Sequence, residues 1–474
     1  MRTIAIIGGG FSGTLAAVNL ARLSEQPLKV VLINAKRLFG RGTAYGATRR
    51  EHLLNVAARN MSAFPDHPNH FYDWLRCRSE FNGVADNELR EMFIPRMVYG
   101  DYIRSLAESH LRPVHSRFNV QFEMIEDEAT DIIWHDSASA NVILSQHDPV
   151  PANAVLLATG NQPPAGLPTE APVKFDQRYC ADPWAPNFAD RLPPQGSEII
   201  ILGTGLTMVD VIMTLDAVGW QGNVTAISRN GMLPKSHFRG IAYPDYLPAD
   251  AESLGLAKLV QLVEENCQRL TRMSQHGAIA VDRLRPHTQA LWKSLSIDDK
   301  KTFLSKYAAV WNVTRHRIAQ SIHNVLTDRL DKGMLQIIPA TIESLATTEK
   351  SIDVRYRDQR REHTISGDFV VNCTGPETKF SDLNVPLFRN LMARGLVCPD
   401  DLDMGIQVDD DFAVLDKSLE RLGNLFAIGP ILKGTLWETT AVPELRSQAR
   451  RVAQVMLDQM PTSLKEENVI EYCI

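Results

Sequence analysis

The chain has 474 residues, of which 44% are hydrophobic and 22% are charged, and its formal net charge is -6. This composition is ordinary for a globular protein of roughly two to four domains, and it excludes a disordered or collagen-like chain. Nucleic-acid binding needs an excess of basic residues that this sequence lacks, so we expect no nucleic-acid partner.

The six cysteines contain no CxxC pair. This argues against a zinc ribbon and against a thioredoxin-type redox pair. A chain of this size needs no disulfides, and we therefore expect a reducing, cytoplasmic location. No segment carries the run of about 18 apolar residues that a membrane span needs, because glycines interrupt the uncharged N-terminal stretch. We expect no membrane partner.

The first nucleotide-binding fingerprint lies near the N-terminus. Residues 4–7 are apolar, as in a buried parallel strand, and residues 14–23 are rich in Ala and Leu, as in a helix. Between them lies GxGxxG, and a second strand at 29–33 completes a βαβ unit. The glycines allow a tight turn, approach of a pyrophosphate and close packing of helix on strand. The residues assigned to dinucleotide contact are Gly8, Gly10, Phe11, Ser12 and Gly13.

Asn34 ends the second strand, at the position where such sites place a ribose-binding acid. An Asn side chain can still hydrogen-bond a 2′-hydroxyl, through neutral bonds. The alternative is an Asn that only shapes the turn.

A second fingerprint follows the strand expected at 198–202. Gly203 and Gly205 form GxG, but Met208 occupies the third glycine position. The flanking pattern supports the site, because residues 209–217 look helical and 223–227 look like the next strand.

Arg229 follows that next strand, where NAD sites place an acid. A guanidinium there can accept the 2′-phosphate of NADPH, and we therefore expect NADPH rather than NADH. The alternative is a solvated surface arginine.

Two further strands end in small residues. Residues 154–158 run into Thr159 and Gly160, and residues 369–373 run towards Gly375. Such ends let the chain cross close to a bound dinucleotide, although each also suits an ordinary strand terminus.

Other motifs extend the pattern along the chain. They are GRGTAYG at 40–46, HLLNV at 52–56, MSAFPD at 61–66, FIPR at 93–96, NCTGP at 372–376 and WETTA at 437–441. Together with the two fingerprints, they resemble the two-dinucleotide-binding flavoproteins. Within these, the chain is similar to the bacterial FAD/NAD(P)-binding group related to flavin-containing and N-hydroxylating monooxygenases, which includes a FAD-dependent urate hydroxylase branch.

The resemblance implies an α/β fold with two Rossmann-like dinucleotide-binding domains and a helical insertion. The FAD domain is expected to be discontinuous, from 1–165 and 366–474. The NAD(P) domain would occupy 166–365, with the helical insertion at about 244–331. Apolar residues recur at helical spacing in the insertion, as expected for a helix face that packs against the core.

The resemblance also implies positions around the flavin. Asn55 would lie near the isoalloxazine ring as a tentative catalytic residue, with a loop-capping Asn as the equal alternative. Tyr45 would stack near FAD, or belong to the core. Gly429 would end the last strand of the FAD domain. Relatives place a ribitol-binding Asp after it, whereas this chain has Pro430.

Residues 315–317 form the basic run Arg-His-Arg. This run could hold an anionic substrate, or it could pair with acidic side chains such as Asp298 and Asp299.

These features predict an FAD-dependent oxidoreductase reduced by NADPH. We expect a monooxygenase that uses O2 to hydroxylate a small polar, nitrogenous, urate-like substrate, with the chemistry supplied by the cofactor. Two alternatives share the nucleotide sites: an NAD(P)H:acceptor reductase or dehydrogenase, and a non-catalytic FAD-binding regulatory protein. We expect no metal.

Overall fold

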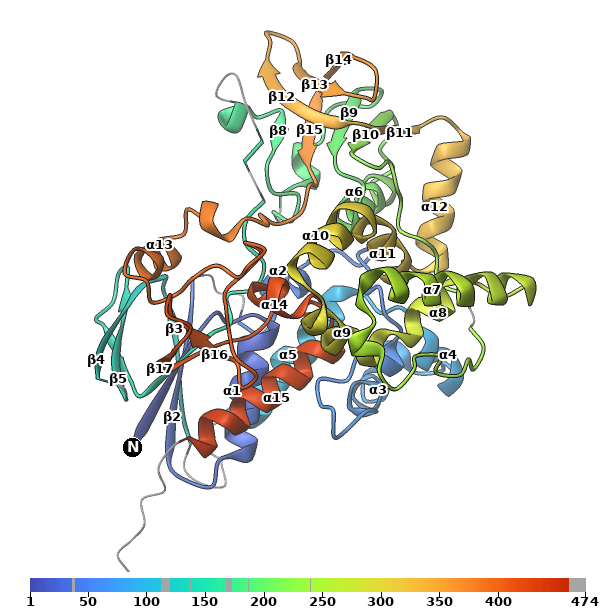
Figure 1. Ribbon diagram of the computed structural model, residues 1–474. Helices are drawn as coiled ribbons and strands as arrows, with labels where there is room; N and C mark the ends of the chain where they lie inside the picture. Colours follow the sequence, from blue (N-terminus) through green and yellow to red (C-terminus); the bar gives the residue numbers. More distant parts are fainter. Residues whose placement is uncertain are drawn as a thin grey trace, which may run out of the picture.

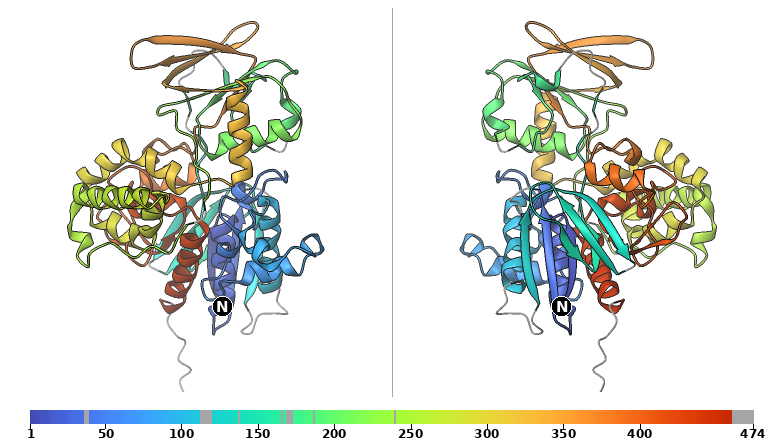
Figure 2. Two further views of the ribbon diagram at one scale, coloured as in Figure 1. Left: turned by 90° about the vertical axis from the view of Figure 1, so that its right-hand side faces the viewer. Right: turned by 90° about the vertical axis from the view of Figure 1, so that its left-hand side faces the viewer.

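The computed structural model describes residues 1–35, 39–111, 120–136, 138–164, 166–167, 173–185, 187–238 and 240–459. Two mainly parallel sheets lie at opposite ends of the molecule, and a helical lobe lies at the side (Figure 1 and Figure 2). Within the described part of the chain, no helix has both the length and the apolar character that a membrane crossing needs.

The first sheet has six strands in the order β16-β17-β7-β1-β2-β3, and all are parallel except the edge strand β16. Its strands are β1 (Arg2–Ile7), β2 (Leu28–Asn34), β3 (Gln121–Glu126), β7 (Ala154–Leu157), β16 (Ala413–Leu415) and β17 (Arg421–Ala427).

Both faces of this sheet are buried, because successive side chains of a strand point to opposite faces. Ile4 and Ile6 of β1 pack on one face under α1 (Phe11–Leu23), α5 (Arg96–His110) and α15 (Val442–Asp458). Ala5 and Ile7 face the other side, which is covered by α13 (Pro386–Ala393) and by a small antiparallel sheet. That sheet comprises β4 (Ala129–Asp136), β5 (Ser139–Leu144) and β6 (Val150–Ala152).

The second sheet has five parallel strands in the order β11-β10-β9-β15-β8. They are β8 (Tyr179–Cys180), β9 (Glu198–Leu202), β10 (Asn223–Ser228), β11 (Leu335–Pro339) and β15 (Phe369–Asn372). Helices α6 (Leu206–Ala217) and α12 (Gln320–Asp331) cover one face. The other face packs against a three-stranded sheet of β12 (Thr341–Thr347), β13 (Ile352–Arg357) and β14 (Glu362–Gly367).

The region predicted as a helical insertion is helical. It contains α7 (Gly255–Arg272), α8 (Ala278–Arg283), α9 (Thr288–Ser294), α10 (Ile297–Lys306) and α11 (Ala308–Arg315), and it continues into α12. Remaining short helices are α2 (Gly42–Tyr45), α3 (His70–Arg76), α4 (Asp86–Glu91) and α14 (Lys433–Leu436), with 3-10 turns at 58–60, 79–81, 173–175, 189–191, 251–253, 285–287, 380–382 and 430–432.

The core of the insertion includes the buried side chain of Trp437, which lies outside the insertion in sequence. Trp437, from the segment between α14 and α15, stacks on Trp292 of α9 with ring centroids 5.0 Å apart. Trp292 in turn donates its indole N–H to the carbonyl oxygen of Gly434, at 2.7 Å. Trp437 has a φ of +58°, a left-handed conformation that is strained for an aromatic residue. The insertion is thus fixed to the chain just before α15.

The expected strands and the α/β fold class are confirmed, and helices α1 and α6 begin three residues earlier than the patterns predicted. The predicted domain boundary at 366 needs a correction. Strand β15 lies after that boundary but pairs with β8 and β9 of the second sheet, so the chain returns to the first sheet only after Asn372. Apolar composition alone did not reveal which sheet this buried strand joins.

Candidate functional site

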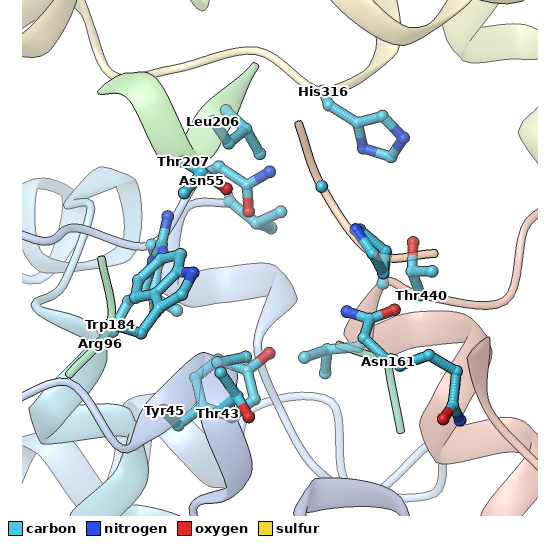
Figure 3. Close-up of a pocket in the computed structure, with 18 of the residues that line it drawn as sticks. Thr43, Tyr45, Asn55, Arg96, Asn161, Trp184, Leu206, Thr207, His316 and Thr440 are labelled. Carbon is cyan, nitrogen blue, oxygen red and sulfur yellow. The ribbon is translucent and has the colours of Figure 1, made fainter. Parts of the chain in front are cut away.

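One cavity of about 1760 Å³ lies where the two sheets and the insertion meet. Figure 3 shows Arg96 and Trp184 on one side of it and His316 and Thr440 on the other. Its volume exceeds the roughly 300–1,000 Å³ of a pocket for one small ligand. It therefore has room for parts of more than one molecule.

The first glycine loop is shaped by contacts that exclude a side chain. Gly8 has a φ of +110°, and a Cβ there would collide with the carbonyl oxygen of Ala158, just after β7. Its N–H donates to the carbonyl of Ile33 on β2, at 2.8 Å. A Cβ at Gly13 would collide with the carbonyl oxygen of Gly8. This is the tight turn and close helix–strand packing expected of the fingerprint.

The second glycine loop repeats this geometry. Gly203 has a φ of +105°, and a Cβ there would collide with the carbonyl oxygen of Cys373, just after β15. Its N–H donates to the carbonyl of Ile227 on β10, at 2.7 Å. The missing third glycine, Met208, is a buried core residue of α6. The chain therefore has two crevices of the same geometry: the first crevice at the Gly8–Gly13 loop and the second crevice at the Gly203–Gly205 loop.

Each crevice ends at an uncapped helix. Gly10 and Gly205 are the N-cap residues of α1 and α6, and neither helix start receives a side-chain cap. The first amides of each helix have no acceptor within the helix, so they suit a phosphate. A Cβ at Gly10 would meet only Gly42 Cα, at 3.5 Å, and one at Gly205 would meet nothing within 4 Å. Described protein atoms thus leave space in front of the first amides of both helices. This space fits the phosphates of a dinucleotide.

Phe11 and Ser12 lie in the first turn of α1 and are both buried. The Phe11 ring packs 5.9 Å from that of Tyr45. Ser12 lies beside Gly429, whose hypothetical Cβ would be 3.3 Å from Ser12 Oγ. The C-terminal segment is thus brought against the first glycine loop.

Asn34 lines the cavity at the end of β2, and its Oδ1 accepts a hydrogen bond from Gly9 N at 2.8 Å. Thr159 also lines the cavity, and its hydroxyl is buried without a hydrogen-bond partner among the described residues. Gly160 follows with a φ of +71° and open space at its Cβ position. An unsatisfied hydroxyl beside the open crevice is consistent with a bound polar group.

Tyr45 and Asn55 both line the cavity (Figure 3). The Tyr45 ring also contacts Tyr99, at 4.7 Å between centroids, and burial raises its pKa to about 12, so the phenol is neutral. The Asn55 carbonyl accepts from His237 Nε2 at 2.9 Å, whereas its side-chain amide makes no hydrogen bond with a described residue. That amide is available to a ligand.

The remaining predicted nucleotide residues occupy different places. Arg229 is exposed just beyond β10 and does not line the cavity. Its neighbour Ser228 bonds Thr204 of the second glycine loop, 2.8 Å between hydroxyl oxygens. Gly375 lines the cavity with a φ of +88°.

Gly429 follows β17 with a φ of +91°. Its N–H donates to Gln448 Oε1 at 3.0 Å, and its carbonyl accepts from Thr439 Oγ1 at 2.9 Å. Pro430 begins a 3-10 turn at the position where the resemblance implies an Asp, and Gly429 before it is held by Gln448 and Thr439. Neither contact was predicted from the sequence, because no pattern pairs Thr439 or Gln448 with Gly429 and the contacts span 10 and 19 positions.

The basic run at the end of α11 is not a solvated surface patch. Arg317 Nη2 lies 2.8 Å from Asp282 Oδ2, rather than near the expected Asp298 and Asp299. His316 lines the cavity, and burial lowers its pKa to about 4, so the imidazole is neutral at pH 7. Arg315 is buried, and its Nη2 lies 3.9 Å from Glu438 Oε2.

No group of three or more His, Cys, Asp or Glu side chains suited to a metal occurs within the described ranges. The five cysteines in those ranges are free. Cys180 and Cys373 are buried in the second sheet, and burial raises the pKa of Cys180 to about 11. Neither has the lowered pKa of a reactive thiol.

Residues 5–162 match the family model described as FAD-NAD(P)-binding. These residues belong to an FAD-NAD(P)-binding domain, whose sheet is completed by β16 and β17. The match includes β1, the first glycine loop, Asn34 and Thr159, and the cavity opens directly onto this FAD-NAD(P)-binding domain. No curated protein sequence matches the chain significantly.

Solved structures share the fold over nearly the full length. Ornithine N-hydroxylase from Kutzneria sp. 744 is 14% identical with a TM-score of 0.65, covering 97% of this chain and 100% of that one. L-lysine 6-monooxygenase from Pseudomonas syringae is 15% identical with a TM-score of 0.63, covering 97% and 100%. Bacillithiol disulfide reductase from Staphylococcus aureus is 13% identical with a TM-score of 0.55, covering 97% and 100%. The chain therefore shares its overall fold with these enzymes, including the part beyond the FAD-NAD(P)-binding domain.

Proposed function

We propose that the chain is an NADPH-dependent flavin monooxygenase that hydroxylates a small polar, nitrogenous substrate. The observation that carries this proposal is the pairing of two equivalent glycine crevices that meet at one large cavity. Two redox cofactors bound there could exchange a hydride without leaving the protein. Likeness of fold to ornithine and lysine hydroxylases supports the oxygenase class, by analogy.

In this proposal FAD occupies the first crevice. Gly8, Gly10 and Gly13 admit its diphosphate, Asn34 hydrogen-bonds its ribose, and Tyr45 packs beside the ring system. Bound FAD supplies hydride acceptance and oxygen activation. The open amide of Asn55 orients a polar atom in the cavity, and the uncapped start of α15 favours negative charge there.

NADPH occupies the second crevice in this proposal. Gly203 and Gly205 admit its diphosphate, and Arg229 binds the 2′-phosphate. The helical insertion closes one side of the cavity and excludes water from the reacting groups.

A coupling experiment tests the function. Purified FAD-loaded protein is mixed with NADPH in air, and NADPH oxidation, oxygen uptake and product are measured with urate, ornithine and lysine. We expect one of these compounds to raise NADPH oxidation and to yield one hydroxylated product per NADPH. If NADPH is consumed with artificial electron acceptors but no compound is hydroxylated, the chain is a reductase. If FAD binds but NADPH is never oxidised, the protein is a non-catalytic FAD-binding protein.

A further inference from the structure

Four arginines of the insertion line the cavity: Arg283 is exposed, and the other three differ in their bonding. Arg285 forms a two-bond ion pair with Glu444, at 2.8 and 3.0 Å. Arg317 pairs with Asp282. Arg315 is only 9% exposed, and its side chain makes no hydrogen bond to any residue that the structure describes. It is the one of the three whose guanidinium has no hydrogen-bonded carboxylate partner among the described residues.

The nearest carboxylates do not satisfy Arg315. Its Nη2 lies 3.9 Å from Glu438 Oε2 and 4.0 Å from Glu444 Oε1, beyond hydrogen-bonding distance. Glu438 is held through its Oε1, which accepts from the Trp311 indole at 2.9 Å, while its Oε2 faces Arg315 and is likewise buried without a hydrogen bond to a described residue. Glu444 is held by Arg285. A buried guanidinium without hydrogen bonds is costly, so this arrangement favours an external anion.

The surroundings do not repel an anion. The charged groups facing Arg315 are Arg285, Arg317, Asp282, Glu438 and Glu444, and the exposed Arg283 lies at the rim. The three carboxylates are matched by the three buried or half-buried arginines. His316, next to Arg315, is neutral and offers one donor and one acceptor without adding charge.

We propose that Arg315 binds a small planar organic anion in this cavity, with His316 as a neutral hydrogen-bond partner, so that the substrate class is anionic. This rests on the proposed function only in taking the bound anion to be the substrate. Carboxylates and the urate monoanion share the required chemistry, because a planar guanidinium can donate two parallel bonds to either.

The test measures binding without turnover. FAD-loaded protein is titrated by calorimetry with benzoate, its neutral analogue benzamide, urate and NADP⁺. We expect the wild-type protein to bind benzoate or urate and to prefer benzoate over benzamide. Arg315→Met should weaken anion binding at least tenfold and abolish that preference, and Arg315→Lys should restore part of it. Arg272→Met removes the same charge from an exposed position at the end of α7, outside the cavity lining, and should change binding less than twofold.

Several results would overturn the proposal. They are the absence of anion binding by the wild-type protein, unchanged anion binding by Arg315→Met, and an equal loss in Arg272→Met. A loss confined to NADP⁺ would assign Arg315 to the nucleotide instead. FAD content and the thermal midpoint establish that each variant is folded, and Arg315→Gln provides a second polar replacement. Anion binding with no NADPH oxidation would contradict the proposed function but would still support the anion site.

Discussion

Arg96 Nη1 lies 2.8 Å from Asp210 Oδ2, and this buried ion pair joins the first helix turn of α5 to α6 of the other sheet. The two side chains are only 13% and 6% exposed. Arg96 Nε also donates to the carbonyl oxygen of Leu53, at 3.0 Å. The pair fixes the relative position of the two nucleotide crevices, because each partner belongs to a helix beside one of them.

Removing one partner of this pair should destabilise the protein strongly. We expect Arg96→Met to lower the free energy of unfolding by roughly 3–5 kcal/mol, because it leaves the Asp210 carboxylate buried and unpaired. Chemical denaturation of the FAD-free protein measures this. The double variant Arg96→Met/Asp210→Leu should be more stable than Arg96→Met alone. Lys332→Met breaks the exposed pair with Asp328 and should cost less than about 1 kcal/mol. An effect of Arg96→Met no larger than that control would contradict the prediction.

The two N-cap glycines allow a ligand-specific test, because protein atoms leave room for a methyl group at both. Gly10→Ala should keep the thermal midpoint within a few degrees but lower FAD content at least tenfold. Gly205→Ala should keep FAD and lose reduction by NADPH. Absorbance spectra and anaerobic reduction measure both. Gly13→Ala, which collides with the Gly8 carbonyl, should instead fail to fold stably. Full FAD content in Gly10→Ala would argue against a diphosphate at this loop.

Arg229 is predicted to select NADPH over NADH. Arg229→Ala should raise the KM for NADPH at least tenfold and leave the KM for NADH almost unchanged, because only NADPH carries the 2′-phosphate. Steady-state NADPH and NADH oxidation measures this. Arg360→Ala removes the same charge from an exposed turn of the same domain and serves as the control. Equal changes for both nucleotides would remove Arg229 from this role.

His316 gives a pH prediction. Burial lowers its folded-state pKa to about 4, below the usual value of 6.5, so the unfolded chain binds the proton more tightly. The contribution of His316 to stability is therefore complete above about pH 6.5, and it is lost as the pH falls towards 4, by at most about 3 kcal/mol. His316→Asn should flatten the stability profile over that range, measured by urea unfolding. His135→Asn, at an exposed position on β4, should leave the profile unchanged.

Local patterns predicted the parts of the fold that depend on neighbouring residues. Strands β1 and β9 and the glycine loops after them follow from short apolar runs and turn residues. The shared geometry of the two loops could be predicted, because each is a tight glycine turn that connects a buried parallel strand to a helix. The Arg96–Asp210 pair could not, since its partners are far apart in sequence and neither residue type is unusual there. The same holds for Gln448 bonding Gly429, and for β15 joining the second sheet.

The strained Trp437 connects the core of the insertion to the start of α15. Its indole completes the insertion core, while its backbone leads within five residues into the helix whose first turn faces the cavity. Loosening of the lobe would remove the packing that holds this torsion, in the segment that leads into the helix start. With FAD bound as proposed, the flavin spectrum would then respond to changes in the core of the insertion.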